Sequence, residues 1–168
     1  DKGIETNMQY IVLDLEWNQA PSREKTVTTP VRLSGEIIQI GAVRVSEAGE
    51  ILETLKCDVR PRHYTQMHYK IREITGITSA QLRRGIPFET AYRQLADFVG
   101  TDSVFLTWGP DDLPMLRTNM ALYGYDTESL PRSYDLQLIF NAAHIRERRQ
   151  CSLAAALELL HMEQSPNM

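Results

Sequence analysis

The sequence predicts an α/β fold built on a mixed sheet, and three observations support this class. Three strand-like segments stand near the start and are joined by short links. Helix-like segments then alternate with one or two further strands, an order that favours a sheet with antiparallel and parallel parts. Finally, neither an internal repeat nor an interdomain linker is found, and 168 residues suit one domain of ordinary size.

The three initial strands are predicted from their apolar patterns. Residues 10–15 (YIVLDL) form a short run rich in β-branched residues, typical of a strand buried on both faces. Residues 36–45 (EIIQIGAVRV) alternate in part, and residues 51–59 follow after a turn at residues 48–50. We therefore expect an antiparallel meander of three strands, with a polar loop at residues 17–34.

The later elements are predicted from helical spacing, turn residues and stop signals. The clearest helix spans residues 88–99, where apolar side chains recur at helical spacing between Pro87 and Gly100. Residues 104–108 are predicted to form a fourth strand. Further helices are expected at residues 69–73, 78–84, 112–123 and 151–160, and a strand that runs into a helix is expected at residues 134–139.

The charge balance gives little indication of a partner, since the formal net charge is −4. Basic residues form three clusters that we interpret mainly as solvated surface: Arg60, Arg62 and His63; Arg83 and Arg84; Arg146, Arg148 and Arg149. No apolar run approaches the ~20 residues of a membrane span. Two cysteines are too few for a disulfide framework, which favours a reducing, cytoplasmic location.

The strongest local signal for chemistry is the acidic pair Asp14 and Glu16. Side chains two residues apart share one face of a strand, so both carboxylates project together from the end of an otherwise apolar strand. Carboxylates this close repel each other unless they are protonated, hydrogen-bonded or bridged by cations. Hard oxygen ligands suit Mg²⁺ or Mn²⁺, and paired ions of this kind catalyse phosphoryl transfer. A solvated strand end with a capping acid is the structural alternative.

A second signal is the segment LTWGPDD at residues 106–112. A strand is expected to end at Trp108, Gly109 and Pro110 turn the chain, and an acid opens the next helix. By itself, Asp111 or Asp112 is interpreted as a helix N-cap. The two roles are compatible, because an acid at a helix start can also reach a metal beside the sheet edge.

These segments together resemble the DEDD-type 3'→5' exonucleases. VLDLEWNQ followed by GEIIQIGAVRV resembles the first motif and second strand of that family, and ITGIT at residues 74–78 resembles a segment that precedes its first long helix. WGPDD matches the second motif and places the family aspartate at Asp112, with Asp111 as the runner-up. DLEWNQ resembles the DEDDh subgroup with the Eri-type and sporulation-inhibitor-like exonucleases. The resemblance covers nearly the whole chain.

The resemblance implies a ribonuclease H-like fold with a mixed five-stranded sheet flanked by helices. It also implies removal of nucleotides from the 3' end of a single strand, with RNA favoured over DNA, by two Mg²⁺ or Mn²⁺ ions held by Asp14, Glu16 and Asp112. Trp17 and Trp108 are predicted to contact the nucleic acid, since bases stack on aromatic faces, although a packing role for Trp17 stays equally open. No nucleotide cofactor is expected, and the oligomeric state is left open.

The family's third motif, a His or Tyr four or five residues before a last Asp, is not found. His144 and His161 lack an Asp at that spacing and are interpreted as ordinary surface or packing residues. We expect one exonuclease domain at residues 8–168 that lacks its final helix, with residues 1–7 as a leader or an artificial addition. Such a chain is expected to be weak or inactive by itself, because no residue would accept the proton of the attacking water.

Two other functions compete with the exonuclease hypothesis. A non-catalytic module that binds RNA or a protein partner would explain the missing third motif. An endonuclease of the ribonuclease H type would share the sheet and the carboxylates. The WGPDD and ITGIT segments speak against the endonuclease, and the products of the reaction would separate the classes.

Overall fold

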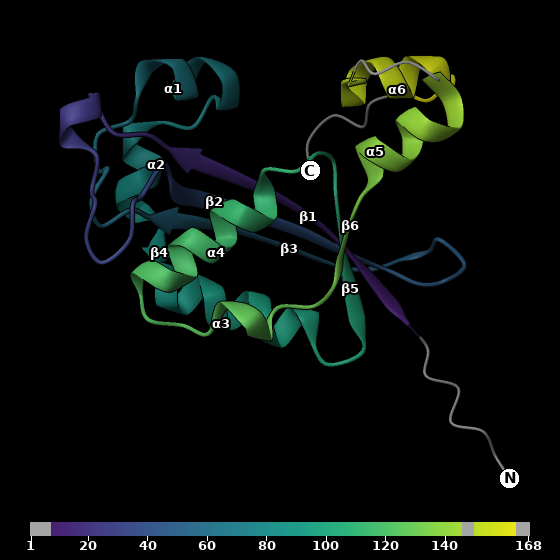
Figure 1. Cartoon of the computed structure of the whole chain (residues 1–168), viewed down its shortest axis with the longest axis horizontal. Coiled ribbons are helices and arrows are strands. Elements are labelled where there is room, and N and C mark those ends of the chain that lie inside the picture. Colours follow the sequence, from purple (N-terminus) through teal and green to yellow (C-terminus); the bar gives the residue numbers. More distant parts are fainter. Residues whose placement is uncertain (1–7, 146–149, 164–168) are drawn as a thin grey trace, which may run out of the picture.

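A computed structural model describes residues 8–145 and 150–163, and it contains the mixed sheet that the sequence predicts (Figure 1). Six strands lie in the order β4-β3-β2-β1-β5-β6. The first three form the predicted antiparallel meander, while β5 runs parallel to β1 and β6 runs parallel to β5. The strands are β1 (Gln9–Asn18), β2 (Glu36–Val45), β3 (Ile51–Arg60), β4 (Ile86–Pro87), β5 (Ser103–Thr107) and β6 (Ser133–Asp135).

Helices cover both faces of this sheet. α3 and α4 lie on one side, and α1, α5 and α6 lie on the other (Figure 1). The helices are α1 (Tyr69–Thr75), α2 (Ser79–Arg84), α3 (Phe88–Val99), α4 (Asp112–Leu122), α5 (Leu136–Phe140) and α6 (Leu153–Leu159), with short turns η1 (Arg23–Lys25), η2 (Thr127–Ser129) and the π-helical η3 (Asn141–Ile145).

Most predicted elements are confirmed, and the differences have physical causes. β1 continues to Asn18 instead of ending at residue 15, because its polar end pairs with the start of β2. β4 was not predicted, since two residues that include a proline carry no strand pattern; it pairs with the end of β3. The predicted leader at residues 1–7 and the cluster Arg146, Arg148 and Arg149 lie outside the described residues.

A bulge in β2 lets Ile37 and Ile40, which are three residues apart, face the same core. Glu16 pairs with Gln39, whereas Trp17 pairs with Ile37, so Ile38 has no partner on β1. Ile37 belongs to the main core against α3 and α4. Ile38 is also fully buried, but it packs with Ile77 and Leu82 beside α2. Within the described part of the chain, no helix is long and apolar enough to cross a membrane.

The buried side chain of Asn119 attaches α4 to the start of β2. Its Oδ1 accepts a hydrogen bond from the Ile37 N–H at 3.0 Å, and its Nδ2 donates to the carbonyl oxygens of Gly35 and Met115 at 3.1 and 3.0 Å. Because Asn119 is fully buried, no water can replace these bonds.

We expect Asn119→Ala to lower the free energy of unfolding by about 2–4 kcal/mol, because it leaves backbone groups of two residues unpaired in the core. Urea denaturation measures this loss. Arg117→Ala, at an exposed position of the same helix, is the control and should change the stability little. Equal losses in the two variants would contradict the assigned role.

Candidate active site

Asp14 and Glu16 lie on the face of β1 that is turned away from the main core. Leu13 and Leu15 are buried between the sheet and the helices α3 and α4, and side chains alternate along a strand. The acids therefore stand on the opposite face, where Asp14 is exposed and Glu16 is partly buried. Both lie within the strand and not at its end as predicted, because β1 continues to Asn18.

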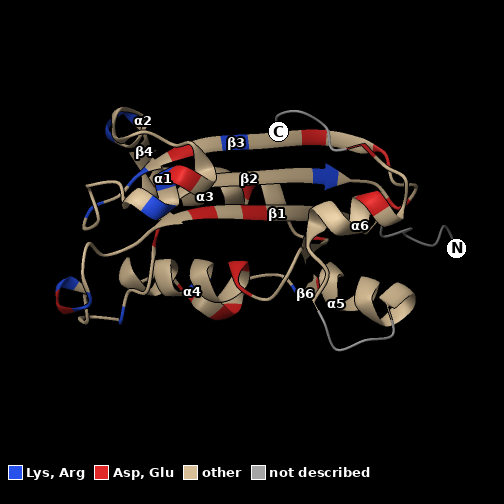
Figure 2. Cartoon of the chain, turned by 90° about the horizontal axis from the view of Figure 1, so that it is seen from above, with Lys and Arg blue, Asp and Glu red and all other residues tan. Residues whose placement is uncertain are grey.

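Asp112 joins this pair through a hydrogen bond to the backbone of β1. The parallel ladder between β1 and β5 ends at the pair Val12 and Leu106. Beyond that point the Leu15 N–H donates to Oδ1 of Asp112 at 2.9 Å. Figure 2 shows the acidic segments of β1 beside the acidic start of α4. The structure thus brings Asp112 to an acidic pair from which nearly a hundred residues separate it in the sequence.

The three carboxyl groups also influence one another electrostatically. Burial raises the pKa of Glu16 from its ordinary 4.5 to about 7, and the charges of Asp14 and Asp112 add to the rise. Burial raises the pKa of Asp112 to about 6 although the Leu15 hydrogen bond opposes it, and the charge of Asp14 contributes further. Desolvation of its carboxyl group also raises the pKa of Asp14, although the residue as a whole is exposed. The three acids therefore form one site of concentrated negative charge.

The chemistry of these donors fits a hard divalent cation. Carboxylate oxygens are the ligands that Mg²⁺ and Mn²⁺ prefer, and a cation would offset both the burial of these charges and the repulsion that adds to the raised pKa values of Glu16 and Asp112. Within residues 8–145 and 150–163, no three His, Cys, Asp or Glu side chains are already arranged to hold a metal ion. The predicted metal-binding role of the three acids stays a prediction.

Asp111, the runner-up, differs from Asp112 in its surroundings. Asp111 is exposed and occupies the N-cap position of α4 without a side-chain hydrogen bond to the helix. Asp112 is only 7% exposed and faces β1. Of the two, Asp112 is the acid that lies with Asp14 and Glu16.

Asn18 is a positioning residue that the sequence analysis did not single out. Its buried amide donates to the carbonyl oxygens of Tyr64 and Gln66 at 2.7 and 2.8 Å and accepts from the His68 N–H at 2.9 Å. These bonds hold the loop before α1 against the end of β1. The sequence contained a signal for Asn18, because it follows Glu16 by two residues and side chains at that spacing share one face of a strand.

The two tryptophans predicted to touch the nucleic acid are both partly buried. Trp17 packs against the main core. Its ring also lies so close to Gly35 that a Cβ at that glycine would be 2.5 Å from Cδ1 of Trp17. The ring centroids of Trp108 and Phe140 lie 5.7 Å apart, and the buried Nε1 of Trp108 has no hydrogen-bond partner among residues 8–145 and 150–163. Contact of either residue with a nucleotide stays a prediction. His144 and His161 are exposed.

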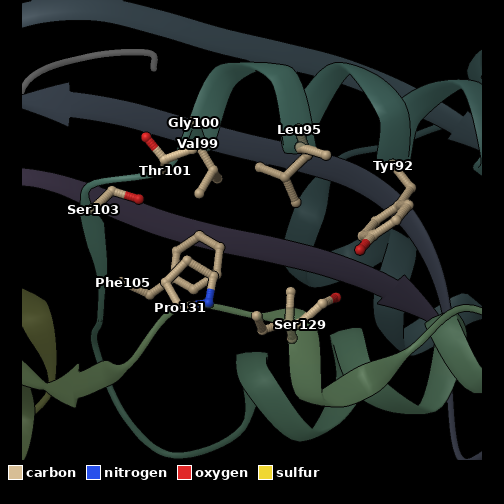
Figure 3. A pocket seen from close by; sticks show the side chains of 11 residues that line it. Tyr92, Leu95, Val99, Gly100, Thr101, Ser103, Phe105, Ser129 and Pro131 are labelled. Atoms are coloured by element: carbon tan, nitrogen blue, oxygen red, sulfur yellow. The ribbon is translucent and has the colours of Figure 1, made fainter.

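A pocket of about 390 Å³ lies elsewhere, between α3 and the segment that follows η2 (Figure 3). Ser103, one of its lining residues, pairs with Gln9 at the start of β1, five residues before Asp14. None of the residues that line this pocket is charged. The pocket is therefore separate from the acidic site.

Comparison with known proteins identifies relatives among the exonucleases. The family model RNase_T, described as Exonuclease, matches residues 12–167. The Bacillus subtilis (strain 168) protein named Probable 3'-5' exonuclease KapD is 27% identical over 115 residues, which are 68% of this chain and 54% of KapD. The chain thus spans about half the length of this curated relative.

Solved structures with the same fold cover nearly the whole chain. The nuclease domain of 3'hExo, described as a DEDDh family member bound to rAMP, has a TM-score of 0.80 at 22% identity over 97% of this chain and 84% of that one. A full-length 3'-exonuclease has the same TM-score and identity over 96% and 54% of the two chains. A 3'-exonuclease that recognises the histone mRNA stem-loop has a TM-score of 0.77 at 22% identity over 95% and 73%. The predicted ribonuclease H-like exonuclease fold is confirmed.

We expect Mn²⁺ at millimolar concentration to raise the melting temperature of the wild-type protein by about 5 °C, because a ligand that binds only the folded state stabilises it. Asp14→Asn should lose most of this shift. Glu50→Gln, an exposed acid at a turn, should keep it. The measurement is the melting temperature of each protein with and without Mn²⁺. A shift of equal size in all three proteins would contradict a metal site at Asp14.

The raised pKa of Glu16 also predicts how stability depends on pH without metal. Between its ordinary 4.5 and about 7, the folded protein keeps a proton that the unfolded chain has lost. The free energy of unfolding should therefore fall as the pH rises through this window. Glu16→Gln should be more stable than the wild type at pH 8 and should lose that advantage towards pH 5. Urea denaturation in EDTA measures the difference in stability between Glu16→Gln and the wild type. A difference that stays the same from pH 5 to pH 8 would refute the prediction.

Proposed function

The chain belongs to the RNase_T exonuclease family, and we propose that it removes nucleotides one at a time from the 3' end of a single-stranded nucleic acid. The single observation that carries the proposal is the convergence of Asp14, Glu16 and Asp112 through the Leu15 hydrogen bond. Three carboxyl groups whose pKa values are raised, chiefly by burial, are unfavourable for folding, so a function that uses them accounts for their presence.

The proposed reaction is hydrolysis of the last phosphodiester bond. A water oxygen bonds to phosphorus, the bond from phosphorus to the preceding 3' oxygen breaks, and that oxygen takes up a proton. Asp14, Glu16 and Asp112 would hold Mg²⁺ or Mn²⁺, which in such sites activates the water and stabilises the leaving oxygen. The chain itself fixes the carboxylate of Asp112 through the Leu15 N–H and holds α1 beside the site through Asn18.

We propose RNA rather than DNA as the substrate. Two neighbours of the same fold are described with rAMP and with a histone mRNA stem-loop, and both ligands carry ribose. Distinguishing RNA from DNA depends on contacts with the 2'-hydroxyl group. Comparing the rates on RNA and DNA strands of one sequence tests the choice.

A non-catalytic binding module is the second candidate. It is favoured by the side-chain arrangement, in which the described residues form no ready metal cluster of three ligands. Such a protein would bind a 3' end without releasing mononucleotides, so one assay of binding and hydrolysis separates the two functions.

We expect the full-length protein to release labelled mononucleotides from uniformly labelled single-stranded RNA with Mn²⁺. Asp14→Ala and Asp112→Asn should each lower kcat by about 10³-fold, because several kcal/mol of transition-state stabilisation are lost. Asp111→Asn is the matched control and should keep most of the activity. Equal rates in Asp14→Ala and the wild type, or a loss in Asp111→Asn as large as in Asp112→Asn, would refute the assignment.

A further inference from the structure

One row of three residues crosses the sheet on the face that carries the acidic pair. Asp14 on β1 pairs with Gly41 on β2, and Gly41 pairs with Lys56 on β3. Residues opposite each other in antiparallel strands project from the same face. The neighbours of Lys56 confirm the orientation, because Leu55 and Cys57 pack against the main core and Lys56 is exposed. In Figure 2 the basic segment of β3 lies level with the acidic segments of β1.

Gly41 leaves the middle of this row without a side chain. A Cβ built at Gly41 would approach only the backbone oxygen of Asp14, at 3.6 Å, an ordinary contact. Two strand spacings separate the backbones of Asp14 and Lys56, about 10 Å. The flexible four-carbon stem of a lysine can therefore extend over Gly41 towards a group bound at the acids.

Lys56 also forms no ion pair with a carboxylate in the part of the chain that the structure describes. Among the described residues, the ion pairs join Arg44 to Glu53 at 3.5 Å and Arg62 to Glu89 at 2.9 Å. No such pair includes Lys56 within the same residues. In the next row, Asp58 accepts a hydrogen bond from Gln39 at 2.7 Å, which directs one of its oxygens towards β2.

We propose that Lys56 binds a backbone phosphate of the strand whose 3' end lies at Asp14, Glu16 and Asp112; this inference rests on the proposed function. Three carboxylates repel a polyanion that approaches them, and an unpaired ammonium group in the same row offsets that repulsion. Lysine binds phosphate as a point charge that needs no fixed geometry, which suits a contact along a flexible single strand. Lys56 is thus a positioning residue for the substrate, and it takes no part in bond breaking.

The test compares Lys56→Gln, Lys56→Arg and Lys25→Gln with the wild type in steady-state hydrolysis of single-stranded RNA at several KCl concentrations. Lys56→Gln should raise KM by about tenfold at low salt and leave kcat within about twofold. The slope of log KM against log salt should fall by about 0.7, the value for one phosphate contact on a single strand. Lys56→Arg should restore both quantities, and Lys25→Gln, which removes an exposed lysine from η1, should change neither.

Unchanged KM and salt slope in Lys56→Gln, with an active wild type, would overturn the inference and leave the proposed function intact. A loss of kcat alone, or a failure of Lys56→Arg to restore KM, would also overturn it. A wild type that neither hydrolyses nor binds the RNA would refute both proposals together.

Discussion

The geometry of the site depends on one hydrogen bond, from the Leu15 N–H to Oδ1 of Asp112. It forms where the parallel ladder between β1 and β5 has ended, so that a backbone donor of β1 is free to meet a side chain. Because Asp112 opens α4, this bond also attaches the start of the helix to the strand. When α4 packs against the main core, it therefore also places Asp112 beside Asp14 and Glu16.

The same arrangement lowers the stability of the fold, because it buries the acidic groups that the site needs for binding a cation. Burial brings Glu16 and Asp112 into surroundings that disfavour their charged forms, and the charge of Asp14 raises the pKa of both further. A folded protein without a cation must keep protons on these groups or accept repulsion. Such a cost is typical of sites that bind ions or charged substrates, and it is consistent with the exonuclease family to which the chain belongs.

Buried polar side chains hold the segments around this site in place. Glu36, only 2% exposed, accepts hydrogen bonds from the N–H groups of Arg62, His63 and Tyr64. Asn18 fixes the next part of the same loop, and Asn119 attaches α4 to the start of β2. A buried amide or carboxylate with all its partners allows little alternative geometry. These side chains therefore hold the backbone segments around the site in one arrangement.

The sequence by itself determined the class of fold, the extent of β2 and α3, and the acidic pair, because periodicity and alternation are local properties. It preferred Asp112 to Asp111 through the family resemblance alone, since both are acids at a helix start. The tertiary structure gave the physical difference, by turning Asp112 towards β1 and Asp111 towards solvent. The bulge at Ile38, the two-residue β4 and the row that joins Asp14 to Lys56 likewise depend on strand register. Register is fixed by pairing between distant segments, and no local pattern encodes it.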